Sequence, residues 1–270
     1  MTAGMGAVVL SVDGVSKTFV ASDGGRVSAL AGVSLDVREG EFVSVIGPSG
    51  CGKSTLFQII GGLLAGDGGS VRVDGHAING AHRDIGMVFQ EESTFPWRTV
   101  VDNVAFPLEL AGLARAQREE KARRFIRLVG LEGFERRYPD ELSGGMRQRT
   151  AIARTLAAEP RILLMDEPFA ALDEQTRILL GDKILHIWRE LKQTTLLITH
   201  NITEAVQLSD RVVVMTYRPG RIKRIIDIDL PRPRDSALIA SAEFGRYVGL
   251  LWQDLREEAT LGLADADTAH

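Results

Sequence analysis

The fold is decided by the stretch Glu41-Phe42-Val43-Ser44-Val45-Ile46-Gly47-Pro48-Ser49-Gly50-Cys51-Gly52-Lys53-Ser54-Thr55-Leu56. A short apolar run stops at Gly47, and helical spacing of apolar residues after it predicts a helix over 53–64. The run lacks clean alternation, as expected of a strand buried on both faces of a parallel sheet, although five residues alone do not exclude a buried helical turn. The glycine-rich loop that follows favours the order strand, loop, helix.

The loop between the predicted strand and helix has the pattern G-x-x-x-x-G-K-[ST]. Its glycines let the backbone turn N–H groups into one anion-sized hollow at the helix N-terminus. The Lys53 ammonium suits β- and γ-phosphates, and the Ser54 hydroxyl suits Mg²⁺. The pattern therefore predicts nucleoside triphosphate binding, with a plain glycine-rich turn as the alternative. The predicted binding residues are Gly47, Pro48, Ser49, Gly50, Cys51, Gly52, Lys53, Ser54 and Thr55.

Composition limits the other classes of function. The chain has 270 residues, 44% of them hydrophobic, and a net charge of −4, so nucleic acid is not favoured as a partner. No run of about 18 apolar residues occurs, and the first residues do not resemble a secretory signal. We therefore expect a soluble, cytosolic chain. Cys51 is the single cysteine, which excludes an internal disulfide. Its place beside Lys53 predicts a thiol that reagents reach and that a bound nucleoside triphosphate protects.

The N-terminal part reads as an edge sheet. Residues 8–12 and 29–37 alternate between apolar and polar, with Gly24-Gly25 between them, which predicts an antiparallel hairpin. Phe19 lies between the two runs, in what we expect to be a polar loop. Its ring is either a stacking surface for a base or a loop anchor.

Polar residues follow two further predicted strands. Gln90 comes after the strand 85–89, and His200 stands at the end of the buried strand 195–199. Ligands of open parallel sheets bind at the carboxyl ends of strands, so both side chains are candidates to reach a nucleotide, its metal or its water. A histidine at this edge is placed to touch a γ-phosphate, whereas an isolated histidine is usually structural.

A third strand, 162–165, is fully apolar and ends in two acids. Asp166 is placed to hold Mg²⁺ through water, and Glu167 is a candidate to orient the attacking water or accept its proton. The alternative is that both acids cap the following helix, which we expect over 174–191.

Residues 91–157 read as a helical insertion. Helical patterns cover 100–110 and 115–129, and the charged side chains of the second are expected to form a solvated face. Ser143 is a good N-cap for a helix to about Ala157, and Gly144 and Gly145 let another group approach the helix start. This start is either a second anion site or a simple capped turn.

The predicted domain organisation is one large domain, 8–230, that contains this insertion. Strands are expected at 211–215 and 221–228, and a proline-containing break separates them from an amphipathic helical tail, 231–259. Residues 1–7 and 260–270 are expected to be disordered.

With these motifs in this order, the chain resembles the nucleotide-binding subunit of an ATP-binding cassette (ABC) transporter over about 8–228. The discriminating stretch is Leu142-Ser143-Gly144-Gly145-Met146, because other phosphate-loop families lack it. The resemblance implies an ATPase with ATP and Mg²⁺ as cofactors. It also implies an α/β P-loop NTPase fold with a central, mostly parallel sheet, an antiparallel β edge subdomain and a helical insertion.

The resemblance also implies roles for single residues. The catalytic residues would be Lys53, Gln90, Glu167 and His200, and the metal-binding residues Ser54, Gln90 and Asp166. ATP contacts beyond the loop would come from the adenine-stacking Phe19, from Ser143, Gly144 and Gly145 of the other subunit, and from Asp173, which links the two sites. Two residues depart from the commonest pattern: Phe19 stands where Tyr is frequent, and Met146 where Gln is usual.

Within this family, five short stretches look like the branch that serves nitrate, aliphatic sulfonate, taurine and related importers: Phe89-Gln90-Glu91-Glu92, Phe95-Pro96-Trp97-Arg98, Asp102-Asn103-Val104, Met146-Arg147-Gln148-Arg149 and Arg218-Pro219-Gly220-Arg221. Importers of pyrimidine precursors and other small anions look similar. Export also stays open, because direction resides largely in the membrane partner.

The resemblance implies a motor that works with partners. Two copies would meet head to tail, with each ATP between Lys53 of one and Ser143 of the other. Phe95-Pro96-Trp97 would line the groove for a membrane permease, or else only anchor the insertion. A solute-binding protein outside the cell would act indirectly, and the subunit would lie peripherally on the cytoplasmic face of the cell (inner) membrane. The rival classes are a soluble cassette ATPase acting on DNA or ribosomes, and a phosphotransferase.

Overall fold

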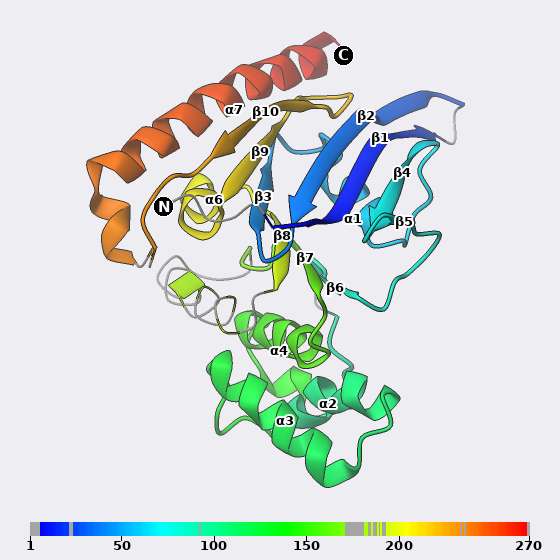
Figure 1. Ribbon diagram of the computed structural model, residues 1–270, viewed down its shortest axis with the longest axis vertical. Coiled ribbons are helices and arrows are strands. Elements are labelled where there is room, and N and C mark those ends of the chain that lie inside the picture. Colours follow the sequence, from blue (N-terminus) through cyan, green and yellow to red (C-terminus); the bar gives the residue numbers. More distant parts are fainter. Residues whose placement is uncertain are drawn as a thin grey trace. The chain divides into compact units, whose positions relative to one another are not determined.

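The computed structural model describes residues 6–21, 24–91, 93–170, 181–182, 185, 188, 190, 193–232, 234 and 236–268. The chain divides into two compact units, Met1–His82 with Thr194–His270, and Arg83–Gln193. The first unit holds β1 (Val8–Val20), β2 (Arg26–Arg38), β3 (Phe42–Ile46), α1 (Lys53–Ile60), β4 (Gly68–Val73), β5 (His76–Ala77), β8 (Thr194–Ile198), α6 (Ile202–Leu208), β9 (Arg211–Met215), β10 (Ile222–Asp227), the 3₁₀ helix η2 (Ser236–Ala240) and α7 (Ala242–Thr268) (Figure 1). The second unit holds β6 (Ile85–Val88), α2 (Val100–Leu110), α3 (Arg115–Leu128), the 3₁₀ helix η1 (Pro139–Glu141), α4 (Gly144–Ala157) and β7 (Ile162–Asp166).

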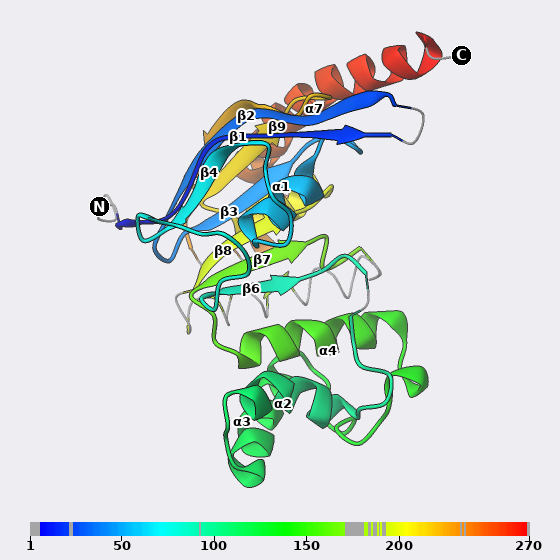
Figure 2. The same ribbon diagram turned by 90° about the vertical axis from the view of Figure 1, so that its right-hand side faces the viewer.

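The antiparallel sheet of the first unit has the strand order β2-β1-β4-β5, and Figure 2 shows β1, β2 and β4 side by side. The hairpin predicted near the N-terminus is confirmed, but its strands are longer than the apolar alternation indicated. Phe19 therefore lies inside β1, opposite Val27, and not in a loop. The expectation of a polar loop was wrong because exposed strand residues such as Phe19 and Val20 break the alternation.

The parallel strands of the first unit are the apolar runs of the sequence. β3 pairs in parallel with both β8 and β9, and β10 pairs antiparallel with β9. All five residues of β3 and of β8 are buried, which explains why neither strand alternates. Helix α1 was expected to reach Leu64 but ends at Ile60. Gly62 adopts φ 71°, and a Cβ there would lie 2.0 Å from the Gly80 carbonyl oxygen, so the chain turns early.

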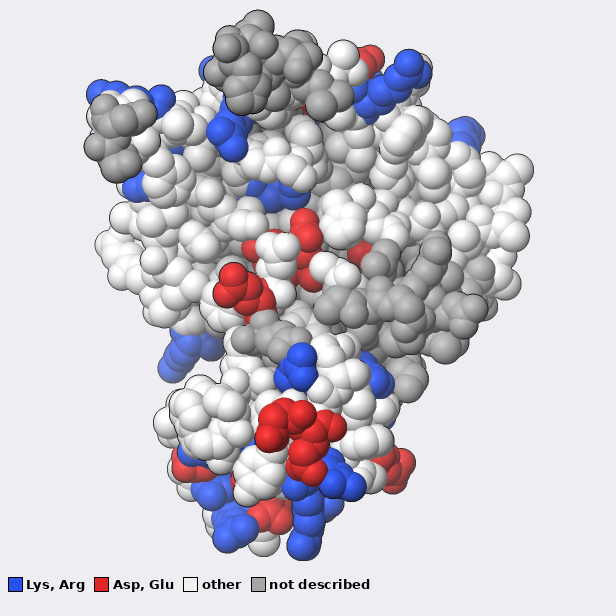
Figure 3. Space-filling model, turned by 180° about the vertical axis from the view of Figure 1, so that it is seen from behind, with Lys and Arg blue, Asp and Glu red and all other residues white. Residues whose placement is uncertain are grey.

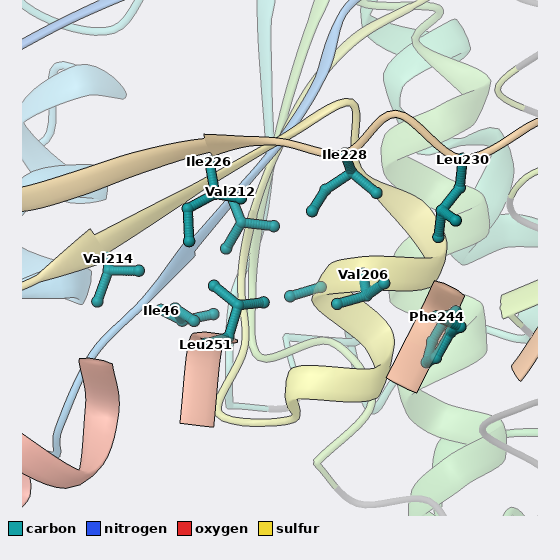
Figure 4. Packing of buried hydrophobic residues seen from close by; sticks show 10 residues of the cluster. Ile46, Val206, Val212, Val214, Ile226, Ile228, Leu230, Phe244 and Leu251 are labelled. Atoms are coloured by element: carbon teal, nitrogen blue, oxygen red, sulfur yellow. The ribbon is translucent and has the colours of Figure 1, made fainter. Parts of the chain in front are cut away.

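Helix α7 packs on the same unit through its apolar face. Phe244 and Leu251 join Val206 of α6, Val214 of β9 and Ile226 of β10 in one buried cluster (Figure 4). The predicted amphipathic helix is thus present, but it continues to Thr268, so the expected disorder of 260–270 is wrong for 260–268. At the other end of the chain, the Ala7 carbonyl accepts from the Glu39 N–H, so the expected disorder of 1–7 fails at this residue.

The second unit contains the predicted helical insertion. The helices predicted at 100–110, 115–129 and 144–157 are confirmed as α2, α3 and α4, and α2 and α3 both pack on α4. Asn103 is fully buried in α2, where its amide donates to the Phe95 carbonyl oxygen over 3.1 Å and its oxygen accepts from the Phe95 N–H over 2.8 Å. This amide fixes the irregular segment that precedes α2.

The charged face of α3 is solvated, as its sequence predicted. Arg115 pairs with Glu119 at 2.8 Å and Lys121 with Glu159 at 2.8 Å, all with partly exposed side chains. In the space-filling view, blue and red atoms lie side by side over the helical unit at the bottom (Figure 3). Because positive and negative side chains alternate on this face of α3, it does not attract ligands of one charge.

Two parts of the prediction have no structural counterpart to compare. Asp173 lies outside the described residues, and so does most of the predicted helix 174–191, of which only five positions are described. Within the described part of the chain, no helix is long and apolar enough to cross a membrane.

Candidate functional site

The phosphate loop, residues 47–55, follows β3 and includes the first turn of α1, so the predicted order of strand, loop and helix is confirmed. Gly50 and Gly52 adopt φ values of 73° and 97°, which side-chain-bearing residues rarely adopt. A Cβ on Gly52 would also lie 2.7 Å from the Ala29 carbonyl oxygen. Gly52 is the N-cap of α1, so no capping side chain competes for the N–H groups of the first turn. These groups can therefore bind an anion.

Lys53 lies across the loop that it follows. Its side chain is largely buried, and Nζ donates to the carbonyl oxygens of Gly47 and Pro48, each over 2.9 Å. An ammonium held inside the loop by two carbonyl groups is placed to exchange these contacts for phosphate oxygens. Ser54 and Thr55 follow in the first turn of α1, half-buried.

The Cys51 side chain lies beside the Lys53 ammonium, whose Nζ donates to Cys51 Sγ over 3.8 Å. It is fully buried, and a Cβ on Gly47 would lie 2.8 Å from its Sγ atom. Burial raises the pKa of the Cys51 thiol, although the nearby Lys53 charge opposes this shift. The expectation of a reachable thiol was therefore wrong, because position in a loop does not specify which way a side chain points.

His200 follows β8 at the sheet edge where β3 delivers the loop. Val45 pairs with Ile198 in parallel register, so both strands end at the same edge. The Thr199 hydroxyl donates to Glu204 over 2.5 Å, and Asn201 caps α6, so the segment around the exposed His200 is held at both sides.

In the second unit, three of the predicted residues come together. Asp166 ends β7 and is 6% exposed, and Gln90 follows β6, whose Val88 pairs with Met165. Gln90 Nε2 donates to Glu167 Oε2 over 3.3 Å. The helix that these two acids would cap in the alternative interpretation begins outside the described residues.

The remaining predicted residues lie elsewhere. Ser143 is the exposed N-cap of α4, and its hydroxyl accepts from the Met146 N–H over 3.3 Å, with Gly144 and Gly145 opening the helix. Phe19 is 41% exposed on β1, with Lys17 Nζ 5.7 Å from its ring centroid. Phe19, the phosphate loop and His200 belong to the first unit, whereas Gln90, Ser143, Asp166 and Glu167 belong to the second.

The prediction from the sequence did not include one set of contacts, those between the stretch 218–220 and the phosphate loop. Arg218 Nε donates to the Gly50 carbonyl oxygen over 2.9 Å, and Gly220 packs on the backbone of Cys51. The stretch Arg218-Pro219-Gly220-Arg221 was noticed only as a branch marker. Its Pro219-Gly220 pair was the available signal, but such a pair marks a turn and does not say what the turn contacts.

The family is shown by comparison with known proteins. The model of the family "ABC transporter" matches residues 30–170. An uncharacterized ABC transporter ATP-binding protein of Methanocaldococcus jannaschii is 54% identical over 89% of this chain and 90% of its own length. A nitrate import ATP-binding protein of Synechocystis is 46% identical over 82% and 83%, and an aliphatic sulfonates import ATP-binding protein of Bacillus cereus is 44% identical over 89% and 94%.

Solved structures agree with the fold described above. A dimeric bacterial ABC transporter cassette matches with a TM-score of 0.75 and 33% identity, covering 82% of this chain and 100% of that one. The same values hold for a dimeric ATP-binding cassette in a post-hydrolysis state with ADP and Pi bound. The predicted α/β fold, with its mostly parallel sheet, antiparallel β subdomain and helical region, is therefore confirmed. The chain belongs to the ABC transporter family, as an ATP-binding subunit that hydrolyses ATP to ADP and phosphate.

Proposed function

We propose that this ATPase powers the import of a small anion or organic sulfonate, of the nitrate, alkanesulfonate or taurine type, through a separate membrane permease. The observation that carries this proposal is the 44–46% identity, over more than four-fifths of the chain, with subunits named for nitrate and aliphatic sulfonate import. The anions share compact, charged oxygen groups. An importer of pyrimidine precursors is the second candidate, and an exporter the third.

In the proposed site, the phosphate loop and Lys53 bind the β- and γ-phosphates of ATP, and Phe19 stacks on the adenine. The exposed ring of Phe19 and the ammonium held within the loop support these roles. His200 contacts the γ-phosphate from the end of β8.

Glu167 orients the attacking water and accepts its proton, and Gln90 helps to place that water. The hydrogen bond between Gln90 and Glu167 supports this pairing. A carboxylate in this position would contribute about 10²–10⁴-fold to the rate.

Ser54 of the first unit, and Gln90 and Asp166 of the second, each carry a side-chain oxygen of the kind that Mg²⁺ prefers. In the described part of the chain, no three His, Cys, Asp or Glu residues cluster as metal ligands. A magnesium ion here would therefore take most of its ligands from phosphate and water, as it commonly does in nucleotide sites. The ion would neutralise charge on the phosphates during transfer.

Two copies of the chain form the working unit, with Ser143, Gly144 and Gly145 of one copy contacting ATP held by the other. The exposed N-cap and bare helix start of α4 suit an anion, and the similar solved cassettes are dimers. Asp173 would link the two sites across the interface.

The permease is contacted by the segment before α2. Trp97 is 72% exposed, and the centroid of its ring lies 5.6 Å from that of Phe95. The exposed ring is thus an apolar surface that packs on a second aromatic ring. Exposed apolar surface of this kind suits a helix of a membrane protein. The subunit would then lie peripherally on the cytoplasmic face of the cell membrane, and a solute-binding protein outside would deliver the anion.

Deletion of the gene tests the substrate class. Growth is measured on taurine, an alkanesulfonate or sulfate as sole sulfur source, and on nitrate or ammonium as sole nitrogen source. The proposal expects loss of growth on an organic sulfonate or on nitrate, normal growth on sulfate and ammonium, and rescue by the wild type. Normal growth of the deletion strain on all five sources would contradict the proposed substrate class.

A further inference from the structure

The loop 216–221, which joins β9 to β10, touches the phosphate loop at two points. Besides its hydrogen bond to the Gly50 carbonyl oxygen, the Arg218 guanidinium lies against Gly50, since a Cβ there would lie 2.7 Å from Arg218 Nη2. A Cβ on Gly220 would lie 2.1 Å from the Cys51 carbonyl oxygen. The two loops are thus in backbone contact.

The loop 216–221 is itself held to the sheet. The Gly220 N–H donates to the Ala29 carbonyl oxygen over 2.9 Å, and the Gly220 carbonyl accepts from the Ala31 N–H over 3.0 Å. The Thr216 hydroxyl donates to the Pro219 carbonyl oxygen over 3.0 Å. Arg218 therefore extends from a braced turn.

The other side of this turn is held by helix α7. Glu258 is 6% exposed; its Oε2 accepts from the Tyr217 N–H over 2.8 Å, and its Oε1 pairs with Lys223 Nζ at 2.9 Å. The Tyr217 ring packs against Gly262, where a Cβ would lie 2.9 Å from Tyr217 Cε2. Because Tyr217 precedes Arg218, a buried carboxylate on α7 fixes the backbone next to the arginine.

The contact to Gly50 has a consequence for the phosphate loop. Gly50 has φ 73°, and a glycine can leave such a conformation at little cost unless something holds it. The peptide group between Gly50 and Cys51 is planar, so fixing the Gly50 carbonyl also fixes the direction of the Cys51 N–H, which points the opposite way. A charge-assisted hydrogen bond to that carbonyl keeps the loop in one shape.

We propose that Arg218 is a positioning residue of the phosphate loop and that Glu258, on α7, keeps Arg218 in place, so that the C-terminal helix contributes to nucleotide affinity. This positioning role rests on the proposed function in one respect only, namely that residues 47–55 bind the phosphates of ATP. Arg218 itself is exposed, so its side chain is not needed to fill the core. Preorganisation of the loop lowers the entropy that binding must remove.

The test compares full-length variants by calorimetric titration with ADP and by the steady-state kinetics of ATP hydrolysis. Arg218→Ala is expected to weaken ADP binding and raise KM for ATP about five- to tenfold, with kcat changed less than twofold, because this factor corresponds to about 1–1.4 kcal/mol, the size of one ordinary intramolecular hydrogen bond. Arg218→Lys should recover part of the affinity. Arg221→Ala, with the same loss of charge, is the matched control, since Arg221 bonds to Thr216 through its backbone.

The role of α7 is tested by Glu258→Gln and by the double variant Arg218→Ala/Glu258→Gln. Glu258→Gln is expected to weaken ADP binding two- to fivefold, and the double variant no more than Arg218→Ala alone, because both changes act on one contact. If the loss of affinity in the double variant equals the product of the losses in the two single variants, the link through Glu258 is overturned. Wild-type affinity in Arg218→Ala, or an equal loss in Arg221→Ala, would overturn the role of Arg218.

Lys53→Ala separates this inference from the proposed function. If Lys53→Ala binds ADP like the wild type, the assignment of the phosphate loop fails, whatever Arg218→Ala shows. If Lys53→Ala loses binding and Arg218→Ala does not, the proposed function stands and the positioning role fails. Unfolding temperatures of all variants are measured, and a loss of affinity in Arg218→Ala counts for the proposal only when its unfolding temperature stays that of Arg221→Ala.

Discussion

Gln90 Nε2 donates a hydrogen bond to Glu167 Oε2 over 3.3 Å, and Glu167 has a φ of 45°. This left-handed conformation costs about 1–3 kcal/mol in a residue with a side chain, and it persists only when surrounding contacts enforce it. The carboxylate is therefore held beside an amide at the ends of β6 and β7, next to Asp166. Two polar groups fixed in this way are suited to place one water molecule.

Glu167→Gln is expected to lower kcat for ATP hydrolysis by at least about 100-fold, because the amide cannot accept a proton. ADP and ATP binding should stay within about twofold, and the variant should accumulate as an ATP-bound dimer in size-exclusion chromatography. Glu159→Gln is the matched control, since Glu159 also has a positive φ, 49°, but pairs with Lys121. A Glu167→Gln variant with normal turnover would remove Glu167 from its role.

The Cys51 thiol is expected to react slowly with maleimide or dithiobis-nitrobenzoate at neutral pH. The side chain of Cys51 is fully buried, so a reagent cannot reach it from solvent. Burial also raises the pKa of the thiol, which lowers the fraction of reactive thiolate. The half-time of labelling in native protein should exceed that in urea-unfolded protein by at least about 100-fold, in line with the rarity of global opening. Equal rates in both would show that the thiol faces solvent.

Gly220→Ala should lower the free energy of unfolding by about 1–3 kcal/mol, since the added methyl meets the Cys51 carbonyl oxygen. Thermal or urea unfolding measures this change. Gly249→Ala on α7 is the control: nothing lies within 4 Å of its Cβ, so a gain of about 0.5–1 kcal/mol is expected from the helix propensity of alanine. Equal stabilities of both variants would refute the close contact.

Leu251→Ala should destabilise the chain by about 2–5 kcal/mol, because Leu251 is fully buried in the cluster that joins α7 to α6 and the sheet (Figure 4). The neighbouring Trp252 is 61% exposed, and Trp252→Ala should change the unfolding free energy by less than about 0.5 kcal/mol. If Leu251→Ala unfolds at the wild-type urea concentration, α7 does not belong to the cooperative core.

Trp97→Ala should reduce co-purification of the permease and the growth that depends on transport, while ATP hydrolysis by the isolated subunit stays unchanged. Trp97 is 72% exposed and stacks at an angle of 34° to Phe95, so its loss removes surface and not core. Trp252→Ala, which removes an exposed tryptophan elsewhere, is the control. Unchanged permease binding and transport in Trp97→Ala would leave the segment as an anchor only.

Much of the fold followed from the sequence because its signals were local. The buried runs around Ile46, Leu164 and Leu197 became β3, β7 and β8, and Ser143 marked the start of α4. The predicted end of a helix was wrong where contacts between residues distant in the sequence determine it. The end of α1 depends on Gly80 against Gly62.

The places of Gln90, Asp166 and His200 at or just after the ends of their strands were predictable, because each strand is an apolar run in the sequence. The direction of the Cys51 side chain was not predictable, because it depends on the geometry of the loop. The contact between Arg218 and Gly50 was not predictable either, because it joins residues more than 160 positions apart. The length of α7 was missed because the residues after Thr260 carry no apolar stripe that requires a helix.

Uptake of labelled solute tests the central claim most directly. Cells lacking the gene receive wild type or Glu167→Gln, both confirmed at equal abundance, and initial rates are measured with labelled taurine, an alkanesulfonate and nitrate. The account predicts that wild type restores inward transport of one of these anions, and that Glu167→Gln leaves it at the level of the deletion strain. Full uptake with Glu167→Gln, or faster efflux in place of uptake with the wild type, would contradict an import motor driven by ATP hydrolysis.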